Sequence, residues 1–268
     1  MTRYARSLTT LESRGADINN PESVKDVMAK QKWQEGTKQS VVNAVLRYYK
    51  YNNINAAFPT YKRQDKVQFI PTEQELDQLI SGCKHRLATF LQTLKETGAR
   101  YGEAYMLKWI DLDTENGTLA ITPEKGSNPR RLKISTKLIG MILQLPRKND
   151  TMFAYGNKDI IRKNFQRARK RIAINLNNPR IRQIHMHTFR HWKASTLFHD
   201  CNNAIIVMKQ LGHKCLNNTQ RYIQLMPEGL DKFVCEFAYT KEDDKRLIEA
   251  GYEFHAKRDD VNIYRKRK

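Results

Sequence analysis

Residues 186–222 read MHTFRHWKASTLFHDCNNAIIVMKQLGHKCLNNTQRY, and this stretch carries the most distinctive residues of the chain. Its apolar spacing and breaks predict helices over roughly 187–199, 203–211 and 217–226. His187 and Arg190 are three residues apart, so they share one helix face. The glycine of LGH suits the end of the second helix. His213 therefore lies just past that end, and Tyr222 follows nine residues later.

The segment before this stretch combines helices with short strands. Thr72 and Glu75 form a capping-box pattern at the start of a helical segment that ends near residue 108, and Gly98 suits a helix C-terminus within it. Asn116-Gly117 is a hairpin turn signal, and a second turn follows at 126–129. Helices resume over roughly 136–145 and 158–176. The chain is therefore predicted to be mainly α with a small antiparallel β-sheet.

Four parts are expected along the chain. Prolines stand at both ends of the segment 58–71, which has no helical stripe and is basic through Lys62, Arg63 and Lys66. The expected parts are a helical domain (1–57), a basic linker (58–71), a domain that holds the distinctive residues (72–226) and a tail of strand, helix and strand (227–268). The helix of the tail is expected at 242–251.

Charge dominates the composition of the chain. Its 268 residues include 48 Lys+Arg and 28 Asp+Glu, which leaves a formal net charge of +20. No carboxylate occurs between Asp159 and Asp200, although ten Lys or Arg lie there. Such an excess predicts a polyanionic partner, most plausibly nucleic acid.

The sequence is expected to be neither that of a membrane protein nor that of a secreted protein. No run of 18 apolar residues is present, and the N-terminus lacks an apolar signal region. The four cysteines are scattered without a C-x-x-C pair, which favours the reducing cytoplasm over a disulfide scaffold. The protein is expected to be cytoplasmic.

Six residues of the sequence have side chains that suit phosphoryl transfer at a DNA phosphodiester. Two arginines can neutralise the charge that develops on the phosphate oxygens. A tyrosine phenol can attack the phosphorus, a lysine can protonate the leaving oxygen, and histidines can orient the phosphate or move protons. Neither a metal nor another cofactor is expected. The six candidates are Arg100, Lys125, His187, Arg190, His213 and Tyr222.

Some of these positions also fit other roles. His187 and His191 have the spacing of a metal-binding pair, but Thr-Phe-Arg lies between them and no third ligand is evident. A structural role fits His191 better. The place of Lys125 in this set could also be taken by one of three cations that follow it closely: Arg130, Arg131 and Lys133.

In these motifs the chain resembles the tyrosine recombinases, a family that includes phage-type integrases and Xer-like recombinases. TGARYGEA is similar to the motif of the first family arginine, with Arg100 in place and Glu103 as its nearby acid. HTFRH resembles the family's H-x-x-R-H box, and LGH followed by Tyr222 keeps the family spacing to the nucleophile.

This resemblance implies a role for each of the six residues. Arg100 and Arg190 would bind the scissile phosphate, Lys125 would be the general acid, and Tyr222 would form a 3′-phosphotyrosyl bond. His187 and His213 would assist through hydrogen bonds and proton transfer.

The resemblance also implies an assembly. Residues 1–57 would be a DNA core-binding domain, shortened by the loss of a helix, and the two domains would clamp double-stranded DNA. A homo-tetramer would form on DNA from monomers or dimers, in the nucleoid. The long tail is similar to that of archaeal members.

Two competing functions use the same residues differently. A type IB topoisomerase-like enzyme would nick and reseal one duplex without joining two sites. A DNA-binding protein that has lost catalysis would act as a regulator or an accessory factor for excision, although the complete set of six residues argues against it.

Overall fold

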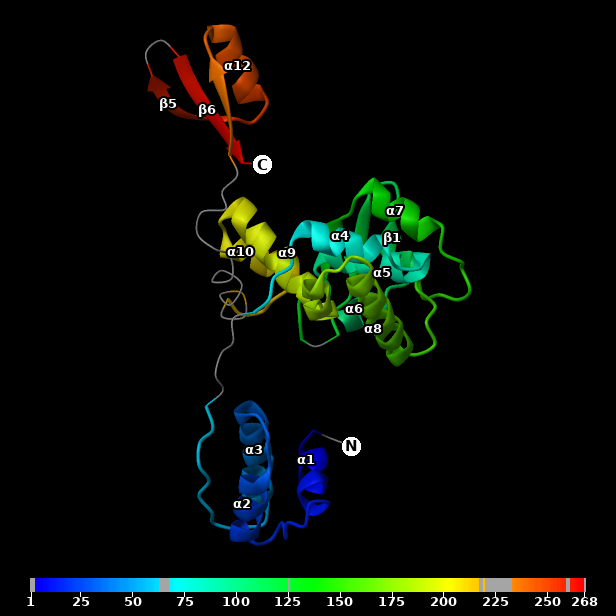
Figure 1. Ribbon diagram of the computed structural model, residues 1–268, viewed down its shortest axis with the longest axis vertical. Coiled ribbons are helices and arrows are strands. Elements are labelled where there is room, and N and C mark those ends of the chain that lie inside the picture. The colour runs from blue at the N-terminus through cyan, green and yellow to red at the C-terminus, as the bar shows by residue number, and fades with distance from the viewer. Residues whose placement is uncertain are drawn as a thin grey trace. The chain divides into compact units, whose positions relative to one another are not determined.

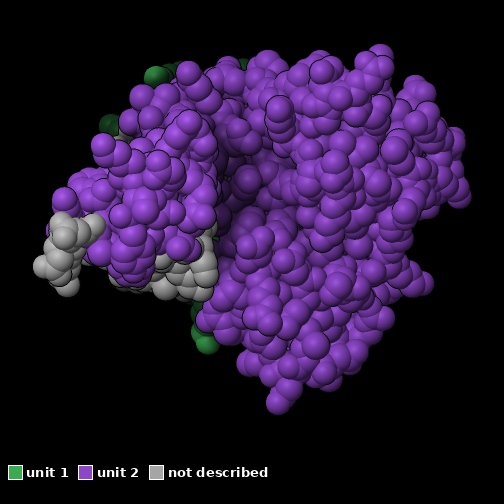
Figure 2. All heavy atoms as spheres, turned by 90° about the horizontal axis from the view of Figure 1, so that it is seen from above, with its two compact units in different colours: residues 1–67 green, residues 68–268 purple. Residues whose placement is uncertain are grey.

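The computed structural model describes residues 3–62, 68–124, 126–216, 219, 233–258 and 261–267. The chain divides into two compact units, residues 1–67 and 68–268, which Figure 2 draws in different colours. Each unit has a hydrophobic core of its own.

The first unit contains three helices, α1 (Arg3–Glu12), α2 (Pro21–Lys30) and α3 (Glu35–Tyr51). Asn20 caps α2, because its side chain accepts hydrogen bonds from the backbone N–H groups of Glu22 and Ser23. The helices pack α1 against α2 and α3. Their shared core contains Leu11, Val24, Met28, Val45 and Tyr49.

Most helices of the second unit surround α5, the helix at its centre (Figure 1). Before the tail, the described helices of this unit are α4 (Glu73–Ser81), α5 (His85–Thr97), α6 (Tyr101–Tyr105), α7 (Thr136–Leu143), α8 (Lys158–Asn175), α9 (Met186–Cys201) and α10 (Ala204–Leu211), with short 3₁₀ turns η1 (Trp109–Asp111) and η2 (Pro179–Gln183). Contacts from α4, α6, α7, α8 and α9 bury α5 on nearly every side. Thr89 and Thr93 also lie in this core. Their hydroxyls are satisfied there because each donates a hydrogen bond to the carbonyl oxygen four residues earlier.

Helix ends in this unit follow local signals. The capping box predicted for Thr72 and Glu75 is present at the start of α4. The region 72–108 expected to be helical consists of three helices, because the chain turns after Gly82 and again at Gly98, whose φ of 61° is left-handed. Arg100 therefore stands at the start of a new short helix, α6.

A small antiparallel sheet follows, with the order β1 (Leu112–Asp113), β2 (Thr118–Ile121) and β3 (Arg130–Lys133). Leu119 of β2 pairs with Leu132 of β3, and both are buried against the helices. The prediction of a mainly helical chain with a small antiparallel sheet is confirmed.

The tail contains one strand more than predicted. Its elements are β4 (Phe233–Ala238), α12 (Lys241–Glu249), β5 (Glu253–Arg258) and β6 (Val261–Arg267), with the sheet order β4-β6-β5. The prediction of strand, helix and strand missed the division between β5 and β6, because no glycine or proline marks a turn there. Ala238, Leu247 and Tyr264 form the small core of this sheet and its helix.

The predicted helix at 217–226 lies outside the described residues, except for Thr219. Across the part of the chain that the structure describes, every helix is too short or too polar to cross a membrane.

Candidate active site

Four of the six predicted residues come from three neighbouring parts of the second unit. Arg100 precedes α6, His187 and Arg190 lie on α9, and His213 follows α10. Contacts of α5 with both α6 and α9, and of α9 with α10, bring these segments together. The charges of both arginines act on both histidines, so the four side chains share one electrostatic environment.

Arg190 is the most deeply buried member of the set, with 1% of the residue exposed. Its Nη1 donates to the carbonyl oxygen of Gly98 at 2.7 Å, and its Nη2 donates to that of Leu211 at 2.7 Å. These carbonyls lie at the ends of α5 and α10, so Arg190 joins both helix ends to α9.

Arg100 lies closer to the surface, with 29% of its side chain exposed. Glu103 orients it in two ways: the carboxylate accepts the Arg100 backbone N–H at 2.9 Å and its Nη1 at 3.0 Å. The same Nη1 also donates to the hydroxyl of Ser127. Arg100 is thus held in one direction while part of its side chain stays accessible.

Glu103 connects Arg100 to a second cation, Arg130. No part of the Glu103 side chain is exposed, and its Oε2 accepts from Arg130 Nη2 at 2.7 Å. Burial by itself would raise the pKa of Glu103, but hydrogen bonds from Arg130 and Arg100 and the charges of Arg130 and Arg190 hold that pKa below its usual value. The carboxylate is therefore ionised at neutral pH.

His187 and His191 form an aromatic pair on α9. Their ring centroids are 4.6 Å apart and the rings are nearly perpendicular, at 89°. Desolvation and the charges of Arg190 and Arg100 lower the pKa of His187. Desolvation, His187 and Arg190 lower the pKa of His191 to about 4. In the described part of the chain, no third His, Cys, Asp or Glu joins this pair in a metal-binding group.

His213 is buried, with 5% exposed, just after the left-handed Gly212. Its Nδ1 lies 2.9 Å from the hydroxyl of Thr219. Desolvation and the positive charges of Arg190, Arg100 and Arg130 lower its pKa to about 4, so the imidazole is neutral at neutral pH. A neutral imidazole can both donate and accept a hydrogen bond beside the arginines.

Lys125 and Tyr222 both lie outside the described residues. Two residues close to Lys125 in sequence have partners in the structure: Glu124 accepts from Lys158 Nζ at 2.6 Å, and Ser127, two residues after Lys125, accepts from Arg100 of the site. Three residues before Tyr222, Thr219 contacts His213.

Of the residues that surround Arg100 in the structure, Glu103 was expected from the sequence, whereas Ser127 and Arg130 were not expected to be parts of this site. Glu103 is three residues from Arg100, a spacing that a sequence reveals. Ser127 and Arg130 reach the site through contacts with residues 27 positions away, and a sequence pattern carries no signal for such a contact.

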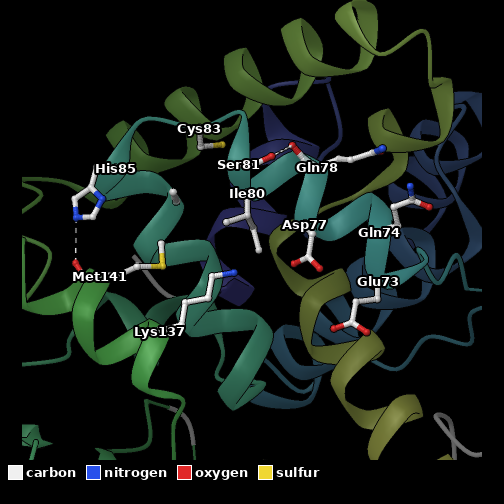
Figure 3. Close-up of a pocket in the computed structure, with 11 residues that line it drawn as sticks. Glu73, Gln74, Asp77, Gln78, Ile80, Ser81, Cys83, His85, Lys137 and Met141 are labelled. Atoms are coloured by element: carbon white, nitrogen blue, oxygen red, sulfur yellow. Dashed lines mark hydrogen bonds between the residues drawn. The ribbon is translucent and has the colours of Figure 1, made fainter. Parts of the chain in front are cut away.

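A separate pocket on this unit is lined by acidic, basic and apolar side chains (Figure 3). Glu73 and Asp77 of α4, His85 of α5 and Lys137 and Met141 of α7 contribute to its lining. The His85 ring lies 3.0 Å from the carbonyl oxygen of Met141. None of the six predicted site residues lines this pocket.

Comparisons with known proteins agree with this picture. A family model described as the phage integrase family matches residues 70–228. Tyrosine recombinase XerA of Saccharolobus solfataricus is 24% identical over 218 residues, which are 80% of this chain and 72% of that protein.

Two solved structures share the fold. A lambda integrase tetramer bound to a Holliday junction matches with a TM-score of 0.65 and 12% identity over 85% of this chain and 72% of that one. The Tn1549 transposon integrase in complex with transposon right end DNA matches with a TM-score of 0.65 and 15% identity over 92% of this chain and 91% of that one.

Proposed function

The chain belongs to the phage integrase family, and we propose that it cleaves and rejoins double-stranded DNA with Tyr222 as its nucleophile. It is a site-specific tyrosine recombinase, a DNA strand transferase. The convergence of two arginines and two histidines from α6, α9 and the end of α10 supports this assignment. The remaining residues of the site, in this proposal, are Arg100, Lys125, His187, Arg190 and His213.

The two arginines have different positions and, we propose, different tasks. Arg100, which is partly exposed, donates to a non-bridging oxygen of the scissile phosphate. Arg190, of which 1% is exposed, adds its positive charge to the phosphate site from the protein interior. Fixed guanidinium groups of this kind stabilise the charge that develops in the transition state.

Cleavage proceeds as a transesterification. The phenol oxygen of Tyr222 bonds to phosphorus and gives up its proton, while the bond to the 5′ oxygen of the DNA breaks. Lys125 donates a proton to that leaving oxygen. A 5′ hydroxyl of the partner strand then attacks the 3′-phosphotyrosyl bond, which releases Tyr222 and rejoins the DNA.

Neutral histidines suit the hydrogen-bonding part of this reaction. Because its pKa is about 4, His213 carries no charge at neutral pH and accepts or donates a hydrogen bond at the phosphate. His187, whose pKa is also lowered, lies on the same α9 face as Arg190 and assists proton transfer from Tyr222.

The assembly proposed for this chain follows its fold relatives. Lambda integrase has been solved as a tetramer on a Holliday junction, and we propose a homo-tetramer on DNA here, formed from free monomers or dimers. Residues 1–57 would contact DNA as a core-binding domain, followed by the basic linker 58–71, the catalytic domain 72–226 and the tail 227–268. A cytoplasmic, nucleoid-associated location follows from such a substrate.

Covalent trapping tests the nucleophile. Incubation with a library of nicked suicide duplexes should yield a protein–DNA adduct, and sequencing of the trapped DNA identifies the cleavage site. Tyr222→Phe should abolish the adduct and retain DNA binding, whereas Tyr239→Phe, at an exposed tyrosine, should behave as wild type. An adduct formed by Tyr222→Phe would disprove the assignment.

Product topology separates recombination from a topoisomerase-like activity. A supercoiled plasmid carrying two copies of the trapped site should yield deletion or inversion products. Relaxation of the plasmid without any exchange between sites would assign the chain to the second class instead.

A further inference from the structure

Arg130, the first residue of β3, is an unusual arginine for its surroundings. Only 5% of its side chain is exposed. Its Nη2 donates to Glu103, but its buried Nε and Nη1 have no hydrogen-bond partner among the described residues. A buried donor without a partner costs about 1–3 kcal/mol, so folding stability gives little reason to keep an arginine here.

An apolar pair in place of Arg130 and Glu103 would serve the core at least as well. Replacing a whole buried ion pair by apolar residues of similar volume is often neutral or stabilising, whereas removing one partner leaves the other charge unpaired. Leu132, two residues along the same strand, is buried and shows that β3 accommodates apolar side chains. The position of Arg130 must therefore be explained by what its charge does.

The charge of Arg130 reaches two parts of the active site. Its Nη2 lies 2.7 Å from Glu103 Oε2, and the other oxygen of that carboxylate accepts from Arg100 Nη1 at 3.0 Å. Its Nη1 is 2.9 Å from the point that a Cβ on Gly212 would occupy, directly before His213. Arg130 thus lies between the carboxylate that orients Arg100 and the loop that carries His213.

We propose that Arg130 is a positioning residue for strand cleavage, which holds the Glu103 carboxylate in the orientation that directs Arg100 at the scissile phosphate. This inference rests on the proposed function, in which Arg100 contacts that phosphate. In the sequence Arg130 is one alternative to Lys125, and this proposal gives it a separate task.

A change in pH dependence distinguishes this task from simple packing. The charged and titratable groups that face Glu103 are Arg100, Arg130, Arg190 and His213. Arg130 supplies the strongest of the interactions that lower the pKa of Glu103. Without it that pKa rises, and a protonated Glu103 no longer accepts from both Arg100 donors.

The test is single-turnover cleavage of the trapped duplex at saturating protein, as a function of pH. Arg130→Met should lower the cleavage rate about 10- to 100-fold, the loss expected when a reacting group shifts slightly. As the pH is lowered, the cleavage rate should begin to fall at a higher pH than in wild type, while DNA binding is retained. The thermal unfolding midpoint should decrease because the buried Glu103 loses a partner, so cleavage is measured well below the midpoint of the variant. Arg130→Lys, which keeps one donor for Glu103, should restore much of the rate and the wild-type pH profile.

A matched control and a double-mutant cycle complete the test. Arg131→Met removes the neighbouring arginine, which is largely exposed, and should leave the single-turnover rate unchanged. The effects of Arg130→Met and Glu103→Gln should be strongly non-additive, because one residue acts through the other.

The outcomes separate this inference from the proposed function. If wild type forms no Tyr222-dependent adduct, the proposed function fails. If wild type forms that adduct, a wild-type rate and pH profile in Arg130→Met would overturn the role of Arg130 alone. Additive effects of Arg130→Met and Glu103→Gln would overturn it as well.

Discussion

The guanidinium of Arg190 and the carbonyl of Gly98 are joined by a hydrogen bond of 2.7 Å across 92 residues of sequence. Gly98 ends α5 in a left-handed conformation, and Leu211, the second carbonyl partner of Arg190, directly precedes the left-handed Gly212 at the end of α10. A positive charge is favourable at helix C-termini, where carbonyl groups lack partners. Arg190 therefore supports the local structure of the site as well as its electrostatics.

Arg190→Met should lower both cleavage and stability. It leaves two carbonyl oxygens without their donor, and an unsatisfied buried group costs about 1–3 kcal/mol. We expect a loss of at least about 2 kcal/mol in the free energy of unfolding in urea, with cleavage of the trapped duplex reduced about 100-fold or more.

Arg100→Met provides the contrast. Arg100 is partly exposed, and Glu103 keeps its bond to Arg130, so cleavage should fall with little change in urea unfolding. Equal destabilisation by the two substitutions would contradict the distinct positions of these arginines.

Gly212→Ala should disrupt the loop that carries His213. The φ of Gly212 is +71°, and an added Cβ would lie 2.7 Å from the carbonyl oxygen of Asn128. A left-handed conformation costs a non-glycine residue about 1–2 kcal/mol, and the backbone contact adds to that cost. Thermal unfolding should show a clear decrease in midpoint.

Gly140→Ala is the matched control for that substitution. Gly140 lies within α7, and nothing is within 4 Å of its added Cβ. Alanine is favoured over glycine in a helix by about 0.5–1 kcal/mol, so this variant should be as stable as wild type or slightly more stable. A smaller loss at Gly212 than at Gly140 would refute the prediction.

Stability should decline as the pH falls from about 6.5 to about 4. The pKa values of His191 and His213 drop from 6.5 to about 4 in the folded protein, so the unfolded chain binds more protons in this range. Above pH 6.5 these neutral histidines contribute fully to the free energy of unfolding. That contribution is lost as the pH falls towards 4 and the two imidazoles become protonated.

The measurement is the urea unfolding free energy across this pH range. His191→Gln should make the decline shallower than in wild type, while His255→Gln, at an exposed position of β5, should reproduce the wild-type curve. Parallel curves for wild type and His191→Gln would show that His191 is not buried in its neutral form.

DNA affinity should depend steeply on salt, because the chain has a net charge of +20. Each phosphate that a cation neutralises adds about 0.9 to the slope of log affinity against log salt concentration. Lys163 and Arg167 are exposed on α8. Replacing both by Gln should lower that slope by about 1.8 in fluorescence titrations with duplex DNA, if both face phosphates.

The exchange of Lys163 for Arg and Arg167 for Lys is the control, since it preserves the charge and should preserve the slope. An affinity that stays constant between low and moderate salt would argue against an interface dominated by phosphates.

Local patterns predicted much of this structure correctly. The capping box of Thr72 and Glu75 begins α4, the glycines at 98 and 212 end α5 and α10, and the sheet lies between α6 and α7 as expected. The resemblance to the tyrosine recombinases is confirmed by the family match over residues 70–228. The roles of all six site residues stay predictions.

Two features were missed for different reasons. The boundary between β5 and β6 has no glycine or proline, and its turn signal, Asp259 and Asp260, is a weaker one that the prediction overlooked. Arg130 appeared to be one cation among several in a basic turn, and its burial against Glu103 depends on how β3 packs beside α6.

The sequence alone determined which residue types are available for phosphoryl transfer and where its helices start and stop, because both depend on neighbours within a few positions. Only the tertiary structure decided which arginine is exposed, which one ties helix ends together and which one shares a carboxylate with Arg100. Those assignments depend on packing between distant segments, which sets the burial and the partners of each charge.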